Sequence, residues 1–159
     1  MRIVVFSDTH GNFSAMHKIF KRNGNADLFI FLGDGEKELK QLSMQYIDCK
    51  ILSVSGNCDV CSAVSNSNEY ILPDGRKIFF THGNKLGVKS STDRLFQKAK
   101  DLGANFALFG HTHCRYSETK DGILMLNPGS AGCPRDGLPA CYAWIDILEN
   151  GVVYNHVNL

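Results

Sequence analysis

The stretch IVVFSDTH, residues 3–10, joins an apolar strand signal to two side chains of types that can bind metals. Residues 3–6 form a continuous run of β-branched and aromatic side chains, which is the pattern of a strand buried on both faces. Asp8 and His10 follow directly and lie two positions apart, so an extended backbone puts both side chains on one side. The stretch therefore predicts a buried strand whose end carries polar ligands.

The order of apolar strand and amphipathic helix continues through the first third of the chain. After Asn12, a favourable N-cap, apolar residues recur at helical spacing. Further buried-strand runs cover residues 28–32 and 51–54, with a short helix around residues 39–42 between them. This β-α-β-α-β order predicts a parallel sheet with helices packed on it.

The second half of the chain is richer in strands. A hairpin is expected over residues 70–80, followed by a helix that is capped at Thr92-Asp93 and carries Leu95, and by a buried strand at 106–109. Two sheets packed together, with helices outside, use all of these elements, and no linker or repeat interrupts them. We therefore expect a single domain over residues 1–159. Later strands are expected at residues 115–120, 123–127, 141–148 and 152–157.

Composition narrows the class of protein. Of the 159 residues, 43% are apolar and 21% are charged, which is ordinary for a globular domain. The net charge of +1 provides no electrostatic reason to expect a nucleic acid or an anionic membrane as partner. No apolar run approaches the ~18 residues of a membrane span, and the polar motif at residues 7–10 rules out a signal peptide. We therefore expect a cytoplasmic protein whose six cysteines stay reduced.

Metal-competent side chains follow five of the predicted strands, mostly beside a glycine. The carboxyl ends of parallel strands are where ligand sites form in α/β sheets. The seven nitrogen and oxygen donors are more than one tetrahedral site needs, but they suit two divalent ions that share a carboxylate. The absence of thiolate argues against a structural zinc and for a hydrolytic site with open positions. The candidate ligands are Asp8, His10, Asp34, Asn57, His82, His111 and His113.

Each of these residues also has an ordinary structural interpretation. A single aspartate after a strand is usually a turn or a cap, and a single histidine is more often on the surface or in the core than a ligand. We interpret His17 and His156 in that way, since neither follows a strand. Five successive strand ends with ligands are better explained by one shared site than by coincidence.

These residues, in this order, resemble the motifs of the calcineurin-like metallophosphoesterases, from residue 1 to about residue 115. The short chain and Cys58 are similar to the small bacterial and archaeal YfcE-type phosphodiesterases. This resemblance implies an α/β fold, a four-layer α-β-β-α sandwich with two mixed central sheets. The matching blocks are Asp8-Thr9-His10, Gly33-Asp34, Gly56-Asn57-Cys58-Asp59, His82-Gly83 and Gly110-His111-Thr112-His113, followed by the N-P-G-S turn Asn127-Pro128-Gly129-Ser130.

The resemblance also implies how the ligands are divided between the ions. Asp34 would bridge two metals ~3.5–4 Å apart, with a water or hydroxide between them that attacks small phosphodiesters in line. Manganese is the first expectation, although this donor set also admits nickel, iron, cobalt or zinc. The first metal would be held by Asp8, His10, Asp34 and His113, and the second by Asp34, Asn57, His82 and His111.

One residue departs from the family pattern. Cys58 stands where much of the superfamily has a histidine thought to protonate the leaving group, and a thiol is a weaker replacement near neutral pH. Diesters or other substrates with acidic leaving groups are therefore expected. Asn57 is assigned to the catalytic centre as well as to a metal, and we expect Asn57 and Arg135 beside the substrate phosphate.

Two other functions compete with the phosphodiesterase. A retromer subunit shares this fold and uses its surface for protein contacts, so a non-catalytic scaffold is the main alternative. A redox or zinc pair at Cys58 and Cys61 is the second, but a zinc ribbon needs another C-x-x-C, and residues 62–68 are polar and loop-like. Association of identical chains is plausible. The physiological substrate depends on loops such as 58–68, 84–91 and 132–139, which the pattern leaves open.

Overall fold

Two five-stranded sheets form the centre of the computed structural model, which describes residues 1–159. The strand order is β10-β9-β1-β2-β3 in the first sheet and β4-β5-β6-β8-β7 in the second. The strands of the first sheet are β1 (Arg2–Phe6), β2 (Leu28–Phe31), β3 (Ile51–Ser53), β9 (Cys141–Leu148) and β10 (Gly151–Asn158). Those of the second are β4 (Ser67–Ile71), β5 (Lys77–Thr81), β6 (Phe106–Phe109), β7 (Arg115–Lys120) and β8 (Ile123–Pro128).

Both sheets are mixed. β1, β2 and β3 are parallel, and β9 and β10 add antiparallel strands at one side. In the second sheet β5, β6 and β8 are parallel, while β4 and β7 pair antiparallel at the two edges. The expected pair of mixed central sheets is confirmed.

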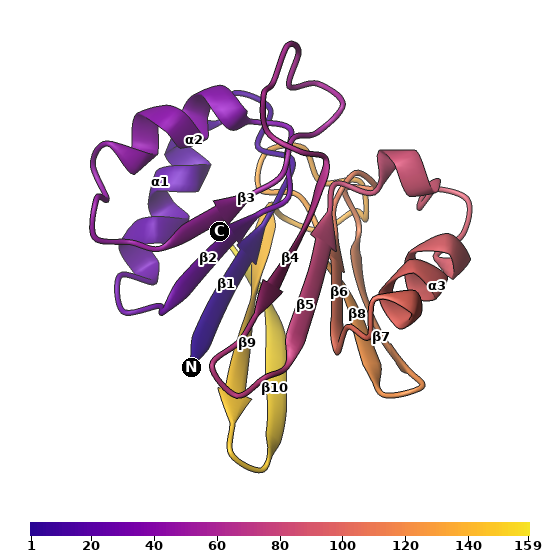
Figure 1. Ribbon diagram of the computed structural model, residues 1–159. Helices are drawn as coiled ribbons and strands as arrows, with labels where there is room; N and C mark the ends of the chain where they lie inside the picture. The colour runs from indigo at the N-terminus through magenta and orange to yellow at the C-terminus, as the bar shows by residue number, and fades with distance from the viewer.

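Helices cover the outer faces of the sheets. α1 (Phe13–Arg22) and α2 (Glu36–Ser43) lie on the first sheet, and α3 (Asp93–Asp101) lies on the second (Figure 1). The predicted four-layer α-β-β-α order is therefore confirmed. None of these helices combines the length and apolar character that crossing a membrane requires.

Alternation along the buried strands builds the layers. Ile3 and Val5 face the second sheet and belong to the core between the sheets, whereas Val4 and Phe6 face α1 on the other side. Because successive side chains of a strand point to opposite faces, a continuous apolar run is what a strand between two layers requires. The run that opens the chain thus predicts its position at the centre of the fold.

One element boundary and one capping contact differ from the sequence expectation. β4 begins at Ser67, inside the segment expected to be a loop, because residues 67–71 pair with β5 although most of their side chains are exposed. In α3 the hydroxyl of Ser91, rather than that of Thr92, accepts a hydrogen bond from the backbone N–H of Asp93 at 3.0 Å. An exposed strand such as β4 has no apolar pattern by which the sequence could reveal it. The sequence also does not show which of two adjacent hydroxyl residues makes the capping hydrogen bond.

Phe20 tests the layer between α1 and the first sheet. Its ring is fully buried and stacks on Phe29 with centroids 4.1 Å apart. Phe20→Ala removes this contact and leaves a cavity, so the free energy of unfolding should fall by about 3–5 kcal/mol. Urea denaturation measures the change, and Ile47→Ala, at a residue that is 81% exposed, should shift stability by less than about 0.5 kcal/mol. Equal effects of the two substitutions would contradict this packing.

Candidate metal centre

All seven predicted ligands meet at one edge of the sandwich. Each follows the carboxyl end of a parallel strand, and the loops after β1, β2 and β3 face those after β5 and β6. The two sheets therefore contribute ligands from opposite sides. The side chains fall into two neighbouring groups that share Asp34.

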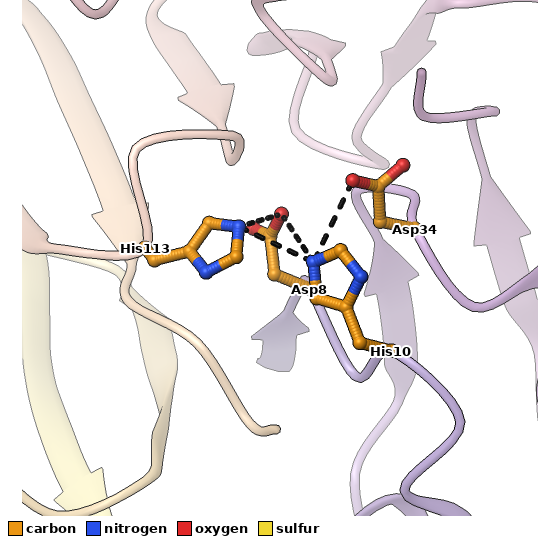
Figure 2. Close-up of side chains that lie close together, drawn as sticks. All are labelled: Asp8, His10, Asp34 and His113. Atoms are coloured by element: carbon orange, nitrogen blue, oxygen red, sulfur yellow. Dashed lines mark hydrogen bonds and ion pairs between the residues drawn. The ribbon is translucent and has the colours of Figure 1, made fainter. Parts of the chain in front are cut away.

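The first group contains Asp8, His10, Asp34 and His113, with one ligand atom of each lying within 4.8 Å of all the others. Figure 2 shows the rings of His10 and His113 facing each other, with Nε2 atoms 3.2 Å apart. Asp8 Oδ1 lies 3.2 Å from His113 Nε2, and Asp34 Oδ2 lies 3.7 Å from His10 Nε2. This spacing is what four ligands around one ion require.

The second group is centred on His82. Its Nε2 lies 3.1 Å from Asn57 Oδ1, 3.2 Å from His111 Nδ1 and 3.5 Å from Asp34 Oδ2. The same oxygen of Asp34 therefore faces His10 in the first group and His82 in the second. A carboxylate in this place can bind two ions at once.

Hydrogen bonds outside the groups fix the tautomers of two histidines. Nδ1 of His113 lies 2.7 Å from the carbonyl oxygen of Cys133, and Nδ1 of His82 lies 2.7 Å from that of Leu32. A carbonyl oxygen only accepts, so each Nδ1 carries the hydrogen, and in the neutral ring Nε2 presents a lone pair to the centre. Supporting carbonyls of this kind orient metal-ligating histidines.

The donor set fits a divalent cation. Asp8 Oδ1 is buried and has no hydrogen-bond partner, although a buried carboxylate oxygen left without one is costly. Asn57 Oδ1 and the lone pair of His82 Nε2, both acceptors, face each other at 3.1 Å. Acceptors that converge without hydrogens between them are stabilised by a positive ion. Carboxylate, amide and imidazole donors together suit first-row transition metals.

Backbone strain is concentrated at the same place. Seven non-glycine residues have positive φ, and five of them are predicted ligands, with φ between 44° and 66°. Such conformations cost about 1–3 kcal/mol each and persist at functional sites where the surroundings enforce them. Left-handed turns directly after the strands aim these side chains back over the sheet edge. The five are Asp8, His10, Asp34, His111 and His113.

The electrostatics of the centre keep Asp8 ionised. Burial alone would raise its pKa, but the interactions with His113 and Ser7 and the charge of His82 outweigh burial and lower it. Asp8 in turn raises the pKa of His113, because the protonated imidazole can donate from Nε2 to this carboxylate. Burial is the main reason that the pKa of His111 falls to about 4, with repulsion from His82 and Lys89 adding to it. His111 is therefore neutral near pH 7 and free to bind a metal.

Asp59 supports the Asp34 loop and was not assigned a role from the sequence. Its carboxylate accepts four backbone N–H groups at 2.8–2.9 Å, from Asp34, Gly35, Glu36 and Gly56. Burial opposes ionisation, but these hydrogen bonds outweigh it and lower the pKa of Asp59. The signal that points to this role is an acidic side chain that faces the first turn of α2, where the backbone N–H groups lack partners within the helix.

The N-P-G-S turn supports the loops after β1 and β6. Ser130 is buried and donates to the carbonyl oxygen of Asp8 at 2.7 Å, which gives its hydroxyl a structural role. Asn127 donates to the carbonyl oxygen of Gly110 at 2.8 Å and to the hydroxyl of Thr112 at 3.0 Å. His156, which lies outside the centre, contacts Asn127 from β10. The turn thereby ties together loops that are more than 100 residues apart in sequence.

Cys58 and Arg135 lie beside the ligands. The backbone N–H of Cys58 donates to Asp34 Oδ1 at 2.7 Å, and the residue as a whole is exposed. Partial burial of the thiol, followed by the nearby carboxylate of Asp34, raises the pKa of Cys58, so the thiol stays protonated near neutral pH. Arg135 is exposed and its backbone N–H donates to the carbonyl oxygen of His113 at 3.0 Å. All six cysteines, Cys61 included, are free.

The fold and this centre define a metallophosphoesterase. The family model of the calcineurin-like phosphoesterase superfamily domain matches residues 1–150. The chain belongs to this superfamily. Both the membership and the ligand group of this chain imply divalent metal ions.

Several individual proteins are similar along nearly the whole chain. Probable metallophosphoesterase YsnB of Bacillus subtilis is 38% identical over 152 residues, covering 94% of this chain and 86% of YsnB. Phosphodiesterase YfcE of Escherichia coli K12 is 26% identical over 170 residues, covering 92% of this chain and 88% of YfcE. These relatives agree with the resemblance to small YfcE-type enzymes.

Solved structures show the same fold. A phosphoesterase-like protein from Streptococcus pneumoniae has a TM-score of 0.86 and 28% identity, covering 99% of this chain and 88% of that one. Vps29 of Entamoeba histolytica, solved with Zn²⁺, has a TM-score of 0.77 and 18% identity, with 99% and 98% covered. The likeness to Vps29 concerns the fold alone.

Gly56 tests the close approach of the loops after β2 and β3. A Cβ on Gly56 would lie 2.5 Å from the backbone nitrogen of Asp34 and closer still to its carboxylate. Gly56→Ala should therefore lower the free energy of unfolding by about 1–3 kcal/mol and weaken Mn²⁺ binding. Gly24→Ala is the matched control, because its Cβ would meet nothing within 4 Å and φ is not positive at either residue. Denaturation and calorimetric titration measure both effects, and unchanged Mn²⁺ affinity in Gly56→Ala would contradict the geometry.

Proposed function

We propose that residues 1–159 act as one domain, a phosphodiesterase that uses two divalent metal ions. The single observation that carries the proposal is that Asp34 Oδ2 faces both groups of ligands, 3.7 Å from His10 Nε2 and 3.5 Å from His82 Nε2. The superfamily membership and relatives named as phosphodiesterases support the reaction class. Manganese remains the first candidate, with nickel, iron, cobalt and zinc as alternatives.

The ligands define what each residue contributes. Asp8, His10 and His113 would complete the first site and Asn57, His82 and His111 the second, with Asp34 common to both. When bound, the two ions would supply Lewis acidity that activates water and offsets charge on the phosphoryl oxygens.

The charge of the ligands favours an anionic substrate. Only Asp8 and Asp34 are anionic, and Asn57 binds through a neutral amide oxygen. The two carboxylates cancel half of the charge of two divalent ions, so the centre keeps a positive charge that attracts a phosphodiester anion. We propose that Asn57 and Arg135 contact that phosphate.

Cys58 favours diesters with acidic leaving groups. Its thiol is protonated near neutral pH but is a much weaker acid than an imidazolium. A leaving group that departs as a stable anion needs little protonation. The proposed substrates are small phosphodiesters in the cytoplasm, and we expect neither a nucleic acid nor a membrane as partner. Association of identical chains is compatible with this function.

A non-catalytic scaffold is the second candidate, favoured only by the fold shared with Vps29. A scaffold needs neither strained ligands nor fixed tautomers, whereas five of the seven candidate ligands here have left-handed backbone. The enzyme therefore accounts for more of what is observed. A redox or zinc pair at Cys58 and Cys61 gains no support, since the group of side chains that could hold a metal ion includes neither thiol.

Metal dependence tests the function directly. The purified chain should hold two equivalents of Mn²⁺, lose hydrolysis of bis(p-nitrophenyl) phosphate after chelation and regain it when Mn²⁺ returns. Asp34→Asn should lower kcat/KM by more than about a hundredfold, because even the partners of metal ligands cost ten- to a hundredfold when removed.

Asp121→Asn is the matched control for Asp34→Asn. Asp121 has a similar left-handed backbone, with φ of 48° against 60° for Asp34, but is exposed and pairs with Lys100. Its substitution should leave activity unchanged. No bound metal and no hydrolysis with any of the candidate ions would favour the scaffold instead.

The leaving-group dependence tests Cys58. Cys58→Ala should hydrolyse nitrophenyl esters about as fast as the wild type, while Cys58→His should accelerate esters of poorer leaving groups by about tenfold or more. A series of aryl esters measures both, with Cys61→Ala as the neighbouring thiol control. Loss of nitrophenyl activity in Cys58→Ala, but not in Cys61→Ala, would show that the thiol takes part in catalysis.

A further inference from the structure

A cavity of about 330 Å³ lies beside the ligand loop after β6, where no role has been assigned. It is lined by residues 88–92, which lead into α3, and by residues at the carboxyl end of β6 and the start of β7. Thr112, the residue between the ligands His111 and His113, is part of its wall. The wall of this space and the metal centre therefore share one continuous loop.

Both walls of the cavity continue directly from ligand loops. Val88 comes shortly after His82 and packs on Gly83, where an added Cβ would lie 2.8 Å from its Cγ2. Cys114 follows His113 on the opposite wall. Lys89 lies at the boundary, close enough for its charge to act on His111. Lys89 therefore places the cavity on the His111 side of the metal centre.

The lining suits an aromatic group attached to an anion. Phe109 and Tyr116 meet edge to face at 5.7 Å, and hydroxyl side chains of the segment before α3 complete the wall. No carboxylate lines the cavity, and Arg115 is neutralised by Asp136 at 2.7 Å. Lys89 forms no ion pair, so it is the free positive charge. Ligand sites commonly combine such apolar walls with a few polar groups.

A second cavity near the centre is less suitable. It has a volume of about 260 Å³, lies beside Cys58 and is lined by two acids, Glu36 and Asp59. Of its two lysines, Lys40 pairs with Glu36 at 2.5 Å. A substituent that carries negative charge is therefore disfavoured in this second cavity.

We propose that the cavity beside Thr112 binds the ester substituent that stays on phosphorus, and that it selects aryl or nucleoside substituents over small alkyl ones. The proposal rests on the phosphodiesterase function proposed above. Residues 88–92 and the adjoining ends of β6 and β7, rather than the metal ligands, would then determine which substrate is preferred.

Two esters that share one leaving group test the assignment. With the Mn²⁺-loaded chain, kcat/KM for p-nitrophenyl phenylphosphonate should exceed that for p-nitrophenyl methylphosphonate by about tenfold, a typical discrimination by one apolar pocket. Thr92→Trp, at a residue whose side chain caps nothing, fills the cavity and should reduce this ratio to about twofold or less. The change should appear mainly in KM.

Val60→Trp is the matched control, because Val60 is 83% exposed and lines the cavity beside Cys58. Its ratio should equal that of the wild type. Ser90→Trp fills the same cavity as Thr92→Trp from a more exposed residue and replaces it if that variant does not fold. Circular dichroism and metal content establish that each variant is folded and loaded.

Three results would overturn the assignment. Equal kcat/KM for the two esters in the wild type would leave the phosphodiesterase intact but exclude a selective cavity. Loss of the ratio in Val60→Trp, with the ratio kept in Thr92→Trp and Ser90→Trp, would move the substituent to the side of Cys58. Hydrolysis of neither ester with any candidate metal would contradict the proposed function itself and this assignment with it.

Discussion

Hydrogen-bond acceptors that face one another impose the main constraint on this protein. Asp8 Oδ1 is buried without a hydrogen-bond partner, and the Nε2 atoms of His82 and His113 present lone pairs because their Nδ1 atoms donate to carbonyl oxygens. Such a set is unfavourable unless positive charge enters it. The raised pKa of His113 beside Asp8 shows that a proton can supply part of that charge. Protons and metal ions therefore compete for the same lone pairs, as is general for metal sites.

The rest of the fold keeps these acceptors together. Parallel strands of two sheets end at the same edge, and left-handed turns after them direct the ligands over the gap between the sheets. Each such turn is unfavourable by itself, at about 1–3 kcal/mol. Asp59 holds the Asp34 loop through four N–H groups, and Ser130 and Asn127 hold the loops after β1 and β6. The supporting hydrogen bonds thus explain how a strained centre persists.

Strand positions and candidate ligands were predictable because both leave patterns in the chain. Apolar runs such as residues 3–6 indicate strands buried between layers, and a polar ligand beside a glycine at each strand end indicates a common edge. The supporting residues were not predictable in the same way. Asp59 and Ser130 bond to backbone groups, which every residue has, so no complementary partner marks them in the sequence. The cavity beside Thr112 depends on how residues 88–92 pack on β6 and β7, which spacing alone does not determine.

The thiol at position 58 and the cavity beside Thr112 lead to the same kind of substrate. A centre without a strong acid gains rate from leaving groups that depart unaided, so little of its catalysis can come from contacts to the departing group. Binding energy must then come from the part of the substrate that stays on phosphorus, and such remote contacts raise kcat when they are realised in the transition state. An aryl or nucleoside substituent held beside Tyr116 and Lys89 would supply that energy. The weak acid on one side of the metals and the selective cavity on the other therefore form one consistent design.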